Sequence, residues 1–356
     1  MMFQKKASFA AAMILTFGLS AACGRDESAG TSATSALTSE LPSCQLATAC
    51  SQALPQLPSP KGFSGLYKKF ITKGKPLHRG RDLIVASGAP IWIQAKFSYG
   101  IVDADLHKEP IDIYLSQGCN SGLKKIGQAI TSNDNDNPAV DDVKDTGGRI
   151  YVNLADLGIK SLPVGRHRVV FVVPGDNTTA ELYITVVDPR QKIVVSDIDG
   201  TLTESELAAA VDVFGGSAKA HAGAPEALQI LKNKGYEIIY LTARAEWFGA
   251  GTRKWLREHG FPLGTLRTTN SKIGATGQPA IDYKTRELVN FYYATGITPT
   301  IALGNKETDV VAYGAVNIEP QNTFFINLDK DLAGGVGFSE YDFITQTFKD
   351  SPKVCI

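Results

Sequence analysis

The sequence predicts two folded domains, an all-β sandwich followed by a three-layer α/β domain built on a parallel sheet. Two observations support this prediction. Between about residues 76 and 187, short runs rich in β-branched and aromatic residues alternate with turn residues. From Lys192 onward, apolar strand-like runs alternate with helical segments, as in parallel sheets with helical crossovers. The chain of 356 residues is long enough for both domains.

Five runs predict the strands of the first domain. Each is short, rich in residues that favour strands, and bounded by turn residues. The runs are 91–97, 111–115, 149–154, 166–173 and 180–187. This spacing is typical of a β-sandwich, and we expect an immunoglobulin-like sandwich over residues 76–188.

The α/β domain is expected over residues 189–356. Its strands are predicted at 193–195, 237–241 and 300–303, and its helices at 225–234, 246–259 and 283–294. Pro225 begins the first helix and Gly235 ends it, while Gly260 ends the second. Four large apolar residues of the second helix are expected to pack in the core: Trp247, Phe248, Trp255 and Leu256.

Two carboxylates follow the first strand of this domain. Asp197 and Asp199 come directly after the apolar run 193–195, and Gly200 and Thr201 begin a turn. Open α/β sheets place their chemistry at the carboxyl ends of strands, so this pair marks a candidate active site. An Asp pair suits phosphoryl transfer, in which one Asp attacks phosphorus, the other handles the proton, and Mg²⁺ offsets the negative charge. The alternative is a solvated turn.

Three later positions offer the other groups that a phosphate needs. Thr242 and Arg244 follow the strand 237–241, where a hydroxyl could donate to a phosphate oxygen and a guanidinium could reach a phosphate or an acidic head group. Lys284, at the start of a helix, could neutralise the transferring group. Each residue alone is typical of an ordinary surface, but their order along the chain favours one site.

The last candidate positions follow the strand 300–303. Asn305 and Asp309 offer the hard oxygen ligands that Mg²⁺ prefers. The alternative is a Gly-Asn turn with an Asp near the start of the next helix. Mg²⁺ is therefore the expected cofactor.

With these motifs assembled, the chain resembles phosphatases of the haloacid dehalogenase superfamily. Within that superfamily, residues 192–329 are similar to the lipin-type (Lipin/Ned/Smp) domain, found in lipins and at the end of metazoan phosphatidylinositol-transfer proteins. The segments that carry the resemblance are 196–203, 240–244, 255–264, Lys284, and Gly304-Asn305 with Asp309. The resemblance implies a haloacid-dehalogenase-like fold and a phosphatidate phosphatase activity. Lipins also join a sandwich to their catalytic domain.

The resemblance also implies roles for individual residues. Asp197 would be the nucleophile and Asp199 the general acid and base, while Thr242 and Lys284 would hold the phosphoryl group. The expected substrate-binding residues are Gly200, Thr201 and Arg244. The expected Mg²⁺ ligands are Asp197, the backbone carbonyl of Asp199, and Asn305 with or without Asp309.

Two departures within the family bear on function. Many superfamily members have Asp where this chain has Asn305, whereas lipins use Asn. This leaves open whether Asn305 or Asp309 is the direct ligand. The transfer-protein branch commonly lacks the intact Asp pair and is read as a phosphatidic-acid binder. This chain keeps both Asp197 and Asp199, which favours catalysis.

Three functional hypotheses follow. The first is a magnesium-dependent phosphatase of the cell envelope that acts on phosphatidic acid or a related lipid phosphate. The second is a non-catalytic phospholipid-binding module, and the third is a phosphatase for small soluble phosphoesters. The intact Asp pair favours the first and third over the second.

The first 23 residues predict an export signal. Lys5 and Lys6 precede a small apolar stretch at 7–19, which is too short for a stable membrane span. Ala21-Ala22-Cys23 resembles the end of a bacterial lipoprotein signal, in which Cys23 is lipidated; ordinary secretory cleavage is the alternative. Residues 24–75, rich in Ser, Thr, Ala, Gly and Pro, are expected to form a flexible tether. The protein is thus expected in a bacterial envelope, anchored by lipid.

The remaining cysteines are expected to form disulfides. Cys44, Cys50, Cys119 and Cys355 allow three connectivities. Proximity favours Cys44 with Cys50, which leaves Cys119 for Cys355. No second Cys pair or His cluster has the spacing of a zinc site.

The charge balance limits the partners. The chain has 36 Lys and Arg residues, 36 Asp and Glu residues and no long basic run, so nucleic acid is not an expected partner. No Lys/Arg-rich helix predicts strong attraction to anionic lipids.

Overall fold

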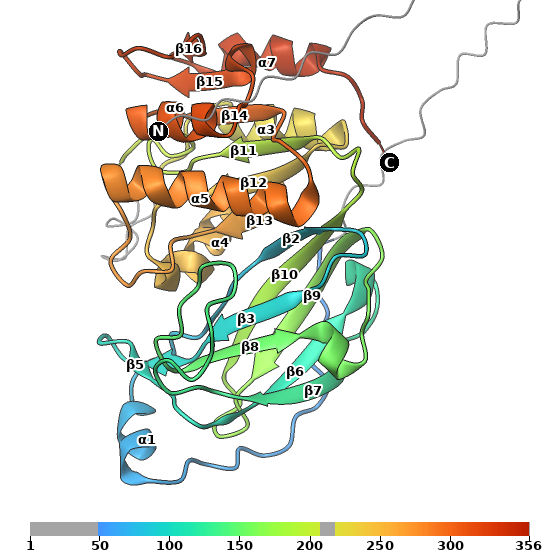
Figure 1. Ribbon diagram of the computed structural model, residues 1–356, viewed down its shortest axis with the longest axis vertical. Helices are drawn as coiled ribbons and strands as arrows, with labels where there is room; N and C mark the ends of the chain where they lie inside the picture. The colour runs from blue at the N-terminus through green and yellow to red at the C-terminus, as the bar shows by residue number, and fades with distance from the viewer. Residues whose placement is uncertain (1–48, 207–217, 356) are drawn as a thin grey trace, which may run out of the picture. The chain divides into compact units, whose positions relative to one another are not determined.

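The computed structural model describes residues 49–206 and 218–355, in which a β-sandwich precedes a parallel α/β sheet (Figure 1). This order agrees with the predicted fold class. The expected export signal at 1–23, with Cys23, and residues 24–48 of the expected tether lie outside the described residues.

The sandwich consists of a three-stranded and a five-stranded sheet, joined by a short hairpin of β4 (Ser98–Tyr99) and β5 (Ala104–Asp105). The smaller sheet has the order β1 (Arg79–Gly80), β3 (Trp92–Lys96), β8 (Arg149–Asn153). The larger has the order β2 (Leu83–Ala86), β10 (Thr179–Val187), β9 (Gly165–Val172), β6 (Pro110–Ser116), β7 (Lys124–Ile130). All pairs are antiparallel except β2 with β10. Side chains such as Ile93, Phe171 and Ile184 fill the space between the sheets.

All five predicted strands of the sandwich are present, whereas β2, β7 and the two-residue strands β1, β4 and β5 were not predicted. β2 has only four residues, which is short for a periodic signal. β7 reads Lys-Lys-Ile-Gly-Gln-Ala-Ile, and its mostly polar composition hides its alternation. Its pairing with β6, rather than its own composition, makes it a strand.

The α/β domain contains a six-stranded sheet in which every pair is parallel. Its order is β13 (Thr265–Arg267), β12 (Glu237–Leu241), β11 (Ile193–Ser196), β14 (Ile301–Gly304), β15 (Thr323–Ile326), β16 (Val336–Phe338). One face packs on α3 (Ala224–Asn233), α4 (Gly249–Glu258) and α7 (Tyr341–Asp350), and the other on α5 (Gln278–Thr295) and α6 (Glu307–Ala315) (Figure 1). This arrangement is the predicted three-layer fold.

Two predicted helices have different boundaries. The helix predicted at 246–259 divides into a 3₁₀ turn, η3 (Glu246–Phe248), and α4. Trp255 and Leu256 lie in the core, but Trp247 and Phe248 are only partly buried. α5 begins at Gln278, before the predicted start at 283, with a proline in its first turn. Proline is well placed there because it has no N–H to leave unpaired.

The predicted disulfide pairing is wrong. Cys50 pairs with Cys119, and Cys355 is also disulfide-bonded. Sequence proximity misled the prediction because residues near Cys50 run along the sandwich: Arg168 donates to the Gln52 carbonyl at 2.8 Å, and Asn177 donates to the Pro58 carbonyl at 2.8 Å.

The tether expectation also fails for residues 49–75. This segment contains α1 (Leu66–Ile71), and Ile71 is buried in the sandwich core. The Lys61 N–H donates to the Pro174 carbonyl at 2.9 Å, and the Phe63 ring lies edge-on to Tyr99. A disulfide and backbone pairing therefore hold a segment whose composition predicts disorder.

The described parts of the two domains belong to one compact unit. Buried polar groups join them: Asp82 of the sandwich accepts from the Leu266 N–H at 3.0 Å and pairs with Arg253. Arg166 donates to the Gly264 carbonyl at 3.0 Å. In the part of the chain that the structure describes, no helix is long and apolar enough to span a bilayer.

Candidate active site

The carboxyl ends of three adjacent strands form the candidate site. β11 pairs in parallel with both β12 and β14, so the segments that follow these strands meet at one edge of the sheet. Asp197 follows β11, Thr242 follows β12, and Asn305 follows β14. The structure thus brings together the strand-end residues that the sequence singled out.

A buried ammonium group joins two of the carboxylates. The Lys284 Nζ atom lies 2.9 Å from Asp197 Oδ1 and 2.6 Å from Asp309 Oδ1. Lys284 is on α5, which packs on the sheet through Tyr283, Leu288 and other apolar residues. Burial alone would lower the pKa of Lys284, but the two carboxylates raise it above its usual value, so the side chain stays charged.

Burial and neighbouring carboxylates disfavour the charged form of Asp197. Burial raises the pKa of Asp197 to about 7, Lys284 opposes this shift, and the nearby charges of Asp309 and Asp199 add to it. Two carboxylates, Asp197 and Asp309, thus share one ammonium group, and the charge of Asp199 lies nearby. A bound cation would offset the remaining repulsion.

The second aspartate of the pair is held by the segment after β12. Arg244 donates to Asp199 through Nε at 2.9 Å and Nη2 at 2.8 Å, and the Thr242 hydroxyl donates to the same carboxylate at 3.1 Å. Arg244 Nη1 also donates to Thr252 at 2.9 Å. Arg244, expected to contact substrate, therefore positions Asp199 in this structure.

The turn after Asp199 depends on Gly200. Its φ of 77° lies in the left-handed region, and a Cβ there would lie 2.2 Å from both the Asn305 amide nitrogen and a Glu206 carboxylate oxygen. The Gly200 N–H donates to the Thr203 hydroxyl at 2.9 Å. The turn thus curls Asp199 back over the site, and in this state the Gly200 N–H has a partner within the chain.

Thr201 supports the neighbouring loop. Its buried hydroxyl donates to Asn305 Oδ1 at 3.1 Å, and its carbonyl accepts from the Tyr341 hydroxyl at 2.8 Å. Glu206 accepts from the Asn305 amide and pairs with Lys306. The sequence analysis missed Tyr341 and Glu206, because neither follows a strand within a recognisable motif.

Asn305 and Asp309 differ in their freedom to bind a cation. Asp309 is fully buried; its Oδ1 accepts from Lys284, and its Oδ2 accepts the N–H groups of Asn305 and Lys306, each at 3.1 Å. Gly304 allows this arrangement, since a Cβ there would lie 2.5 Å from Asp309 Cβ. Asn305 is only partly buried. Among described residues no three His, Cys, Asp or Glu side chains form a metal cluster. The Asn305 amide oxygen is a hard oxygen ligand of the kind that Mg²⁺ prefers.

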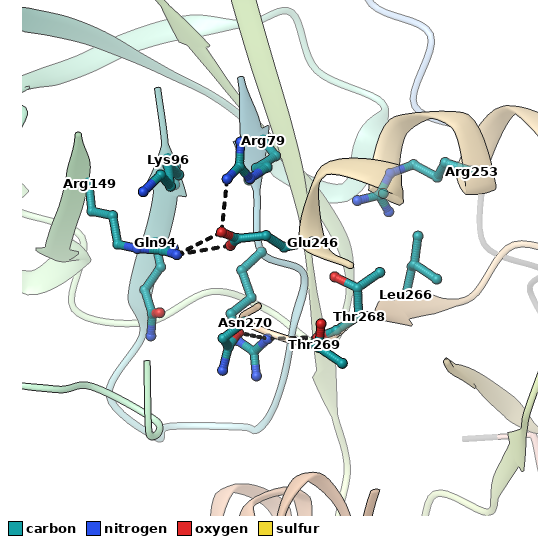
Figure 2. Close-up of a pocket in the computed structure, with 14 residues that line it drawn as sticks. Arg79, Gln94, Lys96, Arg149, Glu246, Arg253, Leu266, Thr268, Thr269 and Asn270 are labelled. Atoms are coloured by element: carbon teal, nitrogen blue, oxygen red, sulfur yellow. Dashed lines mark hydrogen bonds and ion pairs between the residues drawn. The ribbon is translucent and has the colours of Figure 1, made fainter. Parts of the chain in front are cut away.

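A buried ion-pair cluster connects this site to the sandwich (Figure 2). Glu246, just beyond Arg244, accepts from Arg79 at 2.8 Å and from Arg149 at 2.8 and 3.0 Å. Both arginines belong to strands of the sandwich, and Arg79 also forms a bidentate pair with Asp103 at 2.7 and 2.8 Å. The sandwich therefore holds the loop that carries Thr242 and Arg244.

The charges in this cluster depend on one another. Burial would raise the pKa of Glu246, but Arg149 and Arg79 hold it below its usual value. A second segment also holds this loop: Thr269 donates its N–H and its hydroxyl to the Arg244 carbonyl, at 3.0 Å each. Glu246 had no sequence signal, since its partners are more than ninety residues away.

Two protein-family models match consecutive parts of the chain. Residues 76–186 match the model described as "PITM 1-3, beta-sandwich domain", and residues 194–327 match "PITM 1-3, LNS2 domain". Two consecutive parts of the chain are thus similar to the PITM β-sandwich domain and to the LNS2 domain. This agrees with the sequence-based resemblance, while a bacterial origin is not shown.

Similar curated proteins carry both regions. The protein retinal degeneration B of Drosophila melanogaster is 30% identical over 250 residues, which cover 70% of this chain and 18% of that protein. The membrane-associated phosphatidylinositol transfer protein 1 of Rattus norvegicus is 28% identical over 251 residues, with the same coverages. The chain therefore spans about a fifth of the length of these relatives.

Solved structures show weaker likeness. The cobalt-bound deoxy-D-mannose-octulosonate 8-phosphate phosphatase from Haemophilus influenzae is 16% identical, with a TM-score of 0.32, over 45% of this chain and 88% of that one. A phospho-aspartyl intermediate analogue of phosphoserine phosphatase is 14% identical, with a TM-score of 0.33, over 44% and 98%.

The ion-pair cluster predicts a strong effect of Glu246→Gln on stability. The substitution leaves Arg149 buried without its carboxylate, so the free energy of unfolding should fall by about 3 kcal/mol in urea denaturation. The control Glu258→Gln removes the charge of a side chain that is 55% exposed and lies 3.7 Å from Lys254; it should change that free energy by less than about 0.5 kcal/mol.

The same prediction has a pH dependence. Because folding lowers the pKa of Glu246, its contribution to the free energy of unfolding is present above the usual pKa of 4.5 and is lost as the pH falls through the lower folded pKa. The difference in the free energy of unfolding between wild type and Glu246→Gln should therefore shrink below pH 4.5. Equal free energies of unfolding at pH 7 would contradict the role of the cluster.

Proposed function

We propose that this chain is a magnesium-dependent phosphatase that hydrolyses a phosphomonoester through an aspartyl-phosphate intermediate. The observation that carries the proposal is the pair Asp197 and Asp199. Asp197 is buried beside Lys284, and the Asp199 carboxylate accepts hydrogen bonds from Arg244 and Thr242. A module that only bound head groups would not need two carboxylates in these positions.

The chemistry assigned to the pair takes two steps. In the first, a carboxylate oxygen of Asp197 attacks phosphorus, the bond from phosphorus to the ester oxygen breaks, and Asp199 donates a proton to that oxygen. In the second, water attacks the aspartyl phosphate, Asp199 accepts its proton, and inorganic phosphate and the Asp197 carboxylate are released. Lys284 offsets the negative charge of the phosphoryl group, as electrostatic catalysis requires.

Asp197, the Asp199 carbonyl and Asn305 would hold Mg²⁺. When bound, the ion would supply charge neutralisation between the carboxylates and the phosphate. Asp309 is assigned a supporting role, because both its oxygens already accept hydrogen bonds and it is fully buried.

We further propose phosphatidic acid or a related lipid phosphate as the substrate. Both matched family models are PITM models, and relatives are named phosphatidylinositol transfer proteins, which supports a lipid ligand. The same relatives favour the second candidate function, a non-catalytic phospholipid-binding module. A phosphatase for soluble phosphoesters is the third.

A substrate panel tests these alternatives. The purified chain is assayed with phosphatidic acid in detergent micelles and with water-soluble phosphomonoesters, with and without Mg²⁺. We expect Mg²⁺-dependent phosphate release that is fastest with phosphatidic acid. Release only from soluble esters would replace the lipid assignment, and no release from any substrate would favour the binding module.

Asp197→Asn provides the mechanistic test. It removes the nucleophile and a metal ligand with little change in shape, so kcat should fall at least about a thousandfold while the thermal unfolding midpoint is retained. The exposed Asp282→Asn is the matched control and should keep full activity. Substantial turnover by Asp197→Asn would exclude the covalent mechanism.

Metal titration distinguishes the two candidate ligands after β14. Asn305→Ala should raise the Mg²⁺ concentration for half-maximal activity by at least about tenfold, because a ligand is lost. Asp309→Asn should lower kcat, since Lys284 loses a partner, and should leave that concentration nearly unchanged. The reverse pattern would make Asp309 the direct ligand.

We also propose that the protein is exported and anchored through lipidated Cys23. Several acyl chains would hold it firmly, because each buried methylene contributes about 0.8 kcal/mol. Wild type should then enter the detergent phase of a phase-separation assay, and Cys23→Ser should remain in the aqueous phase. A wild-type N-terminus other than a modified Cys23 would refute the anchor.

A further inference from the structure

Five large apolar side chains project into solvent from three segments of the described chain. Leu66 and Phe70 of α1 are 89% and 74% exposed, Ile101 and Val102 at the turn between β4 and β5 are also exposed, and Ile273 is 93% exposed. Exposed apolar residues are common singly, but a group of such residues calls for an explanation.

Backbone contacts place the first two segments together. The Gly100 N–H donates to the Lys75 carbonyl at 2.8 Å, and a Cβ at Gly74 would lie 2.7 Å from the Gly100 Cα. The Tyr67 hydroxyl donates to the Asp105 carbonyl at 3.2 Å. The end of α1 is therefore packed against the turn that carries Ile101 and Val102.

The third segment continues the same surface towards the active site. Lys272, next to Ile273, donates to the Asp103 carbonyl at 3.1 Å. On its other side, the Ala275 N–H donates to the carbonyl of Ala243, the residue between Thr242 and Arg244, at 2.9 Å. The three segments that carry the apolar residues thus lead from α1 to the rim of the candidate active site.

Lysines are interspersed with these apolar residues. Between residues 61 and 77 the chain has five lysines and no Asp or Glu, and four of the five are exposed: Lys61, Lys69, Lys73 and Lys75. The nearest acidic side chains are already paired, Asp103 with Arg79, Asp105 with Lys96, and Glu109 with Lys68. The net charge of this surface is therefore positive, although that of the chain is zero.

We infer that this surface binds an anionic lipid bilayer directly. The term docking face is used for Leu66, Phe70, Ile101, Val102 and Ile273 with Lys69, Lys73 and Lys75. The apolar side chains would enter the interfacial region of the bilayer, and the lysines would lie among anionic head groups. The occupant is a bilayer surface, not a single lipid in a pocket.

The chemistry of the face favours a bilayer over a protein partner. Its apolar groups protrude separately from a short helix, a turn and a loop, each beside a lysine, and a fluid interface accommodates such an arrangement without a matching shape. The complementary charge would come from anionic lipids, whose attraction for lysines falls within a Debye length of the surface.

The docking face would bring the candidate active site to its substrate. This part of the inference rests on the proposed lipid phosphatase function, whereas bilayer binding itself does not. The contact differs from a Cys23 anchor, because it orients the domain rather than merely retaining it near the membrane.

Vesicle sedimentation tests the inference on the full chain with Cys23→Ser and Asp197→Asn, so that neither acylation nor turnover contributes. Vesicles contain phosphatidylcholine alone or with phosphatidylserine, and no phosphomonoester. Leu66→Ser/Phe70→Ser should lower the partition coefficient on the anionic vesicles at least about tenfold, because two large apolar groups are lost. Lys69→Glu/Lys73→Glu/Lys75→Glu should lower it similarly and remove most of its salt dependence.

Matched controls separate the face from general surface effects. Val311→Ser/Phe343→Ser changes apolar residues that are 49% and 68% exposed on α6 and α7, and Lys160→Glu/Lys330→Glu/Lys353→Glu reverses the same number of exposed charges elsewhere. All variants share one N-terminus, so a difference between sets belongs to the face. Equal binding by the face variants and their controls would overturn the inference.

Two further measurements complete the test. With Asp197 restored, Leu66→Ser/Phe70→Ser should hydrolyse a soluble phosphoester at the wild-type rate but phosphatidic acid in vesicles more slowly. If no substrate is hydrolysed, the proposed function fails, while the sedimentation result still decides the docking face. Conversion of a wild-type dimer to a monomer by Leu66→Ser/Phe70→Ser would instead assign the face to self-association and overturn the inference.

Discussion

The candidate site depends on one buried ammonium group. Taking Lys284 out of water is costly, and the cost is offset because Asp197 and Asp309 both pair with it. Asp309 in turn accepts the N–H groups that begin α6, so one carboxylate links helix α5, the loop after β14 and the first aspartate. The packing of α5 on the sheet brings these groups together, and the active-site geometry follows from it.

The sandwich contributes to the site without touching it. Glu246 is two residues beyond Arg244, and its two arginine partners come from β1 and β8. Because the sandwich supplies the cations and the α/β domain supplies the carboxylate, each domain would leave a buried charge unpaired without the other. This mutual dependence gives a physical reason for the two domains to occur together in this chain, where the two PITM models match consecutive parts.

The structure supports a second proposed means of membrane attachment beside the acyl anchor. The sequence offered no basic helix and a balanced charge, so an acyl anchor was the expected means of attachment. The lysines of residues 61–75 are spread over a loop and a six-residue helix, and the apolar residues beside them come from three segments. Only folding places them on one surface, and only folding reveals that the nearby carboxylates are already paired.

The sequence by itself determined the fold class, the positions of half of the described strands and the set of residues at the carboxyl ends of β11, β12 and β14. These features are local, because strand patterns and strand-end motifs are written in consecutive residues. The tertiary structure decided which residues pair: Arg244 with Asp199, Asp309 with Lys284, Glu246 with Arg79 and Arg149, and Cys50 with Cys119. Such pairs join residues far apart in the chain, and their formation depends on the packing of helices and sheets rather than on sequence spacing.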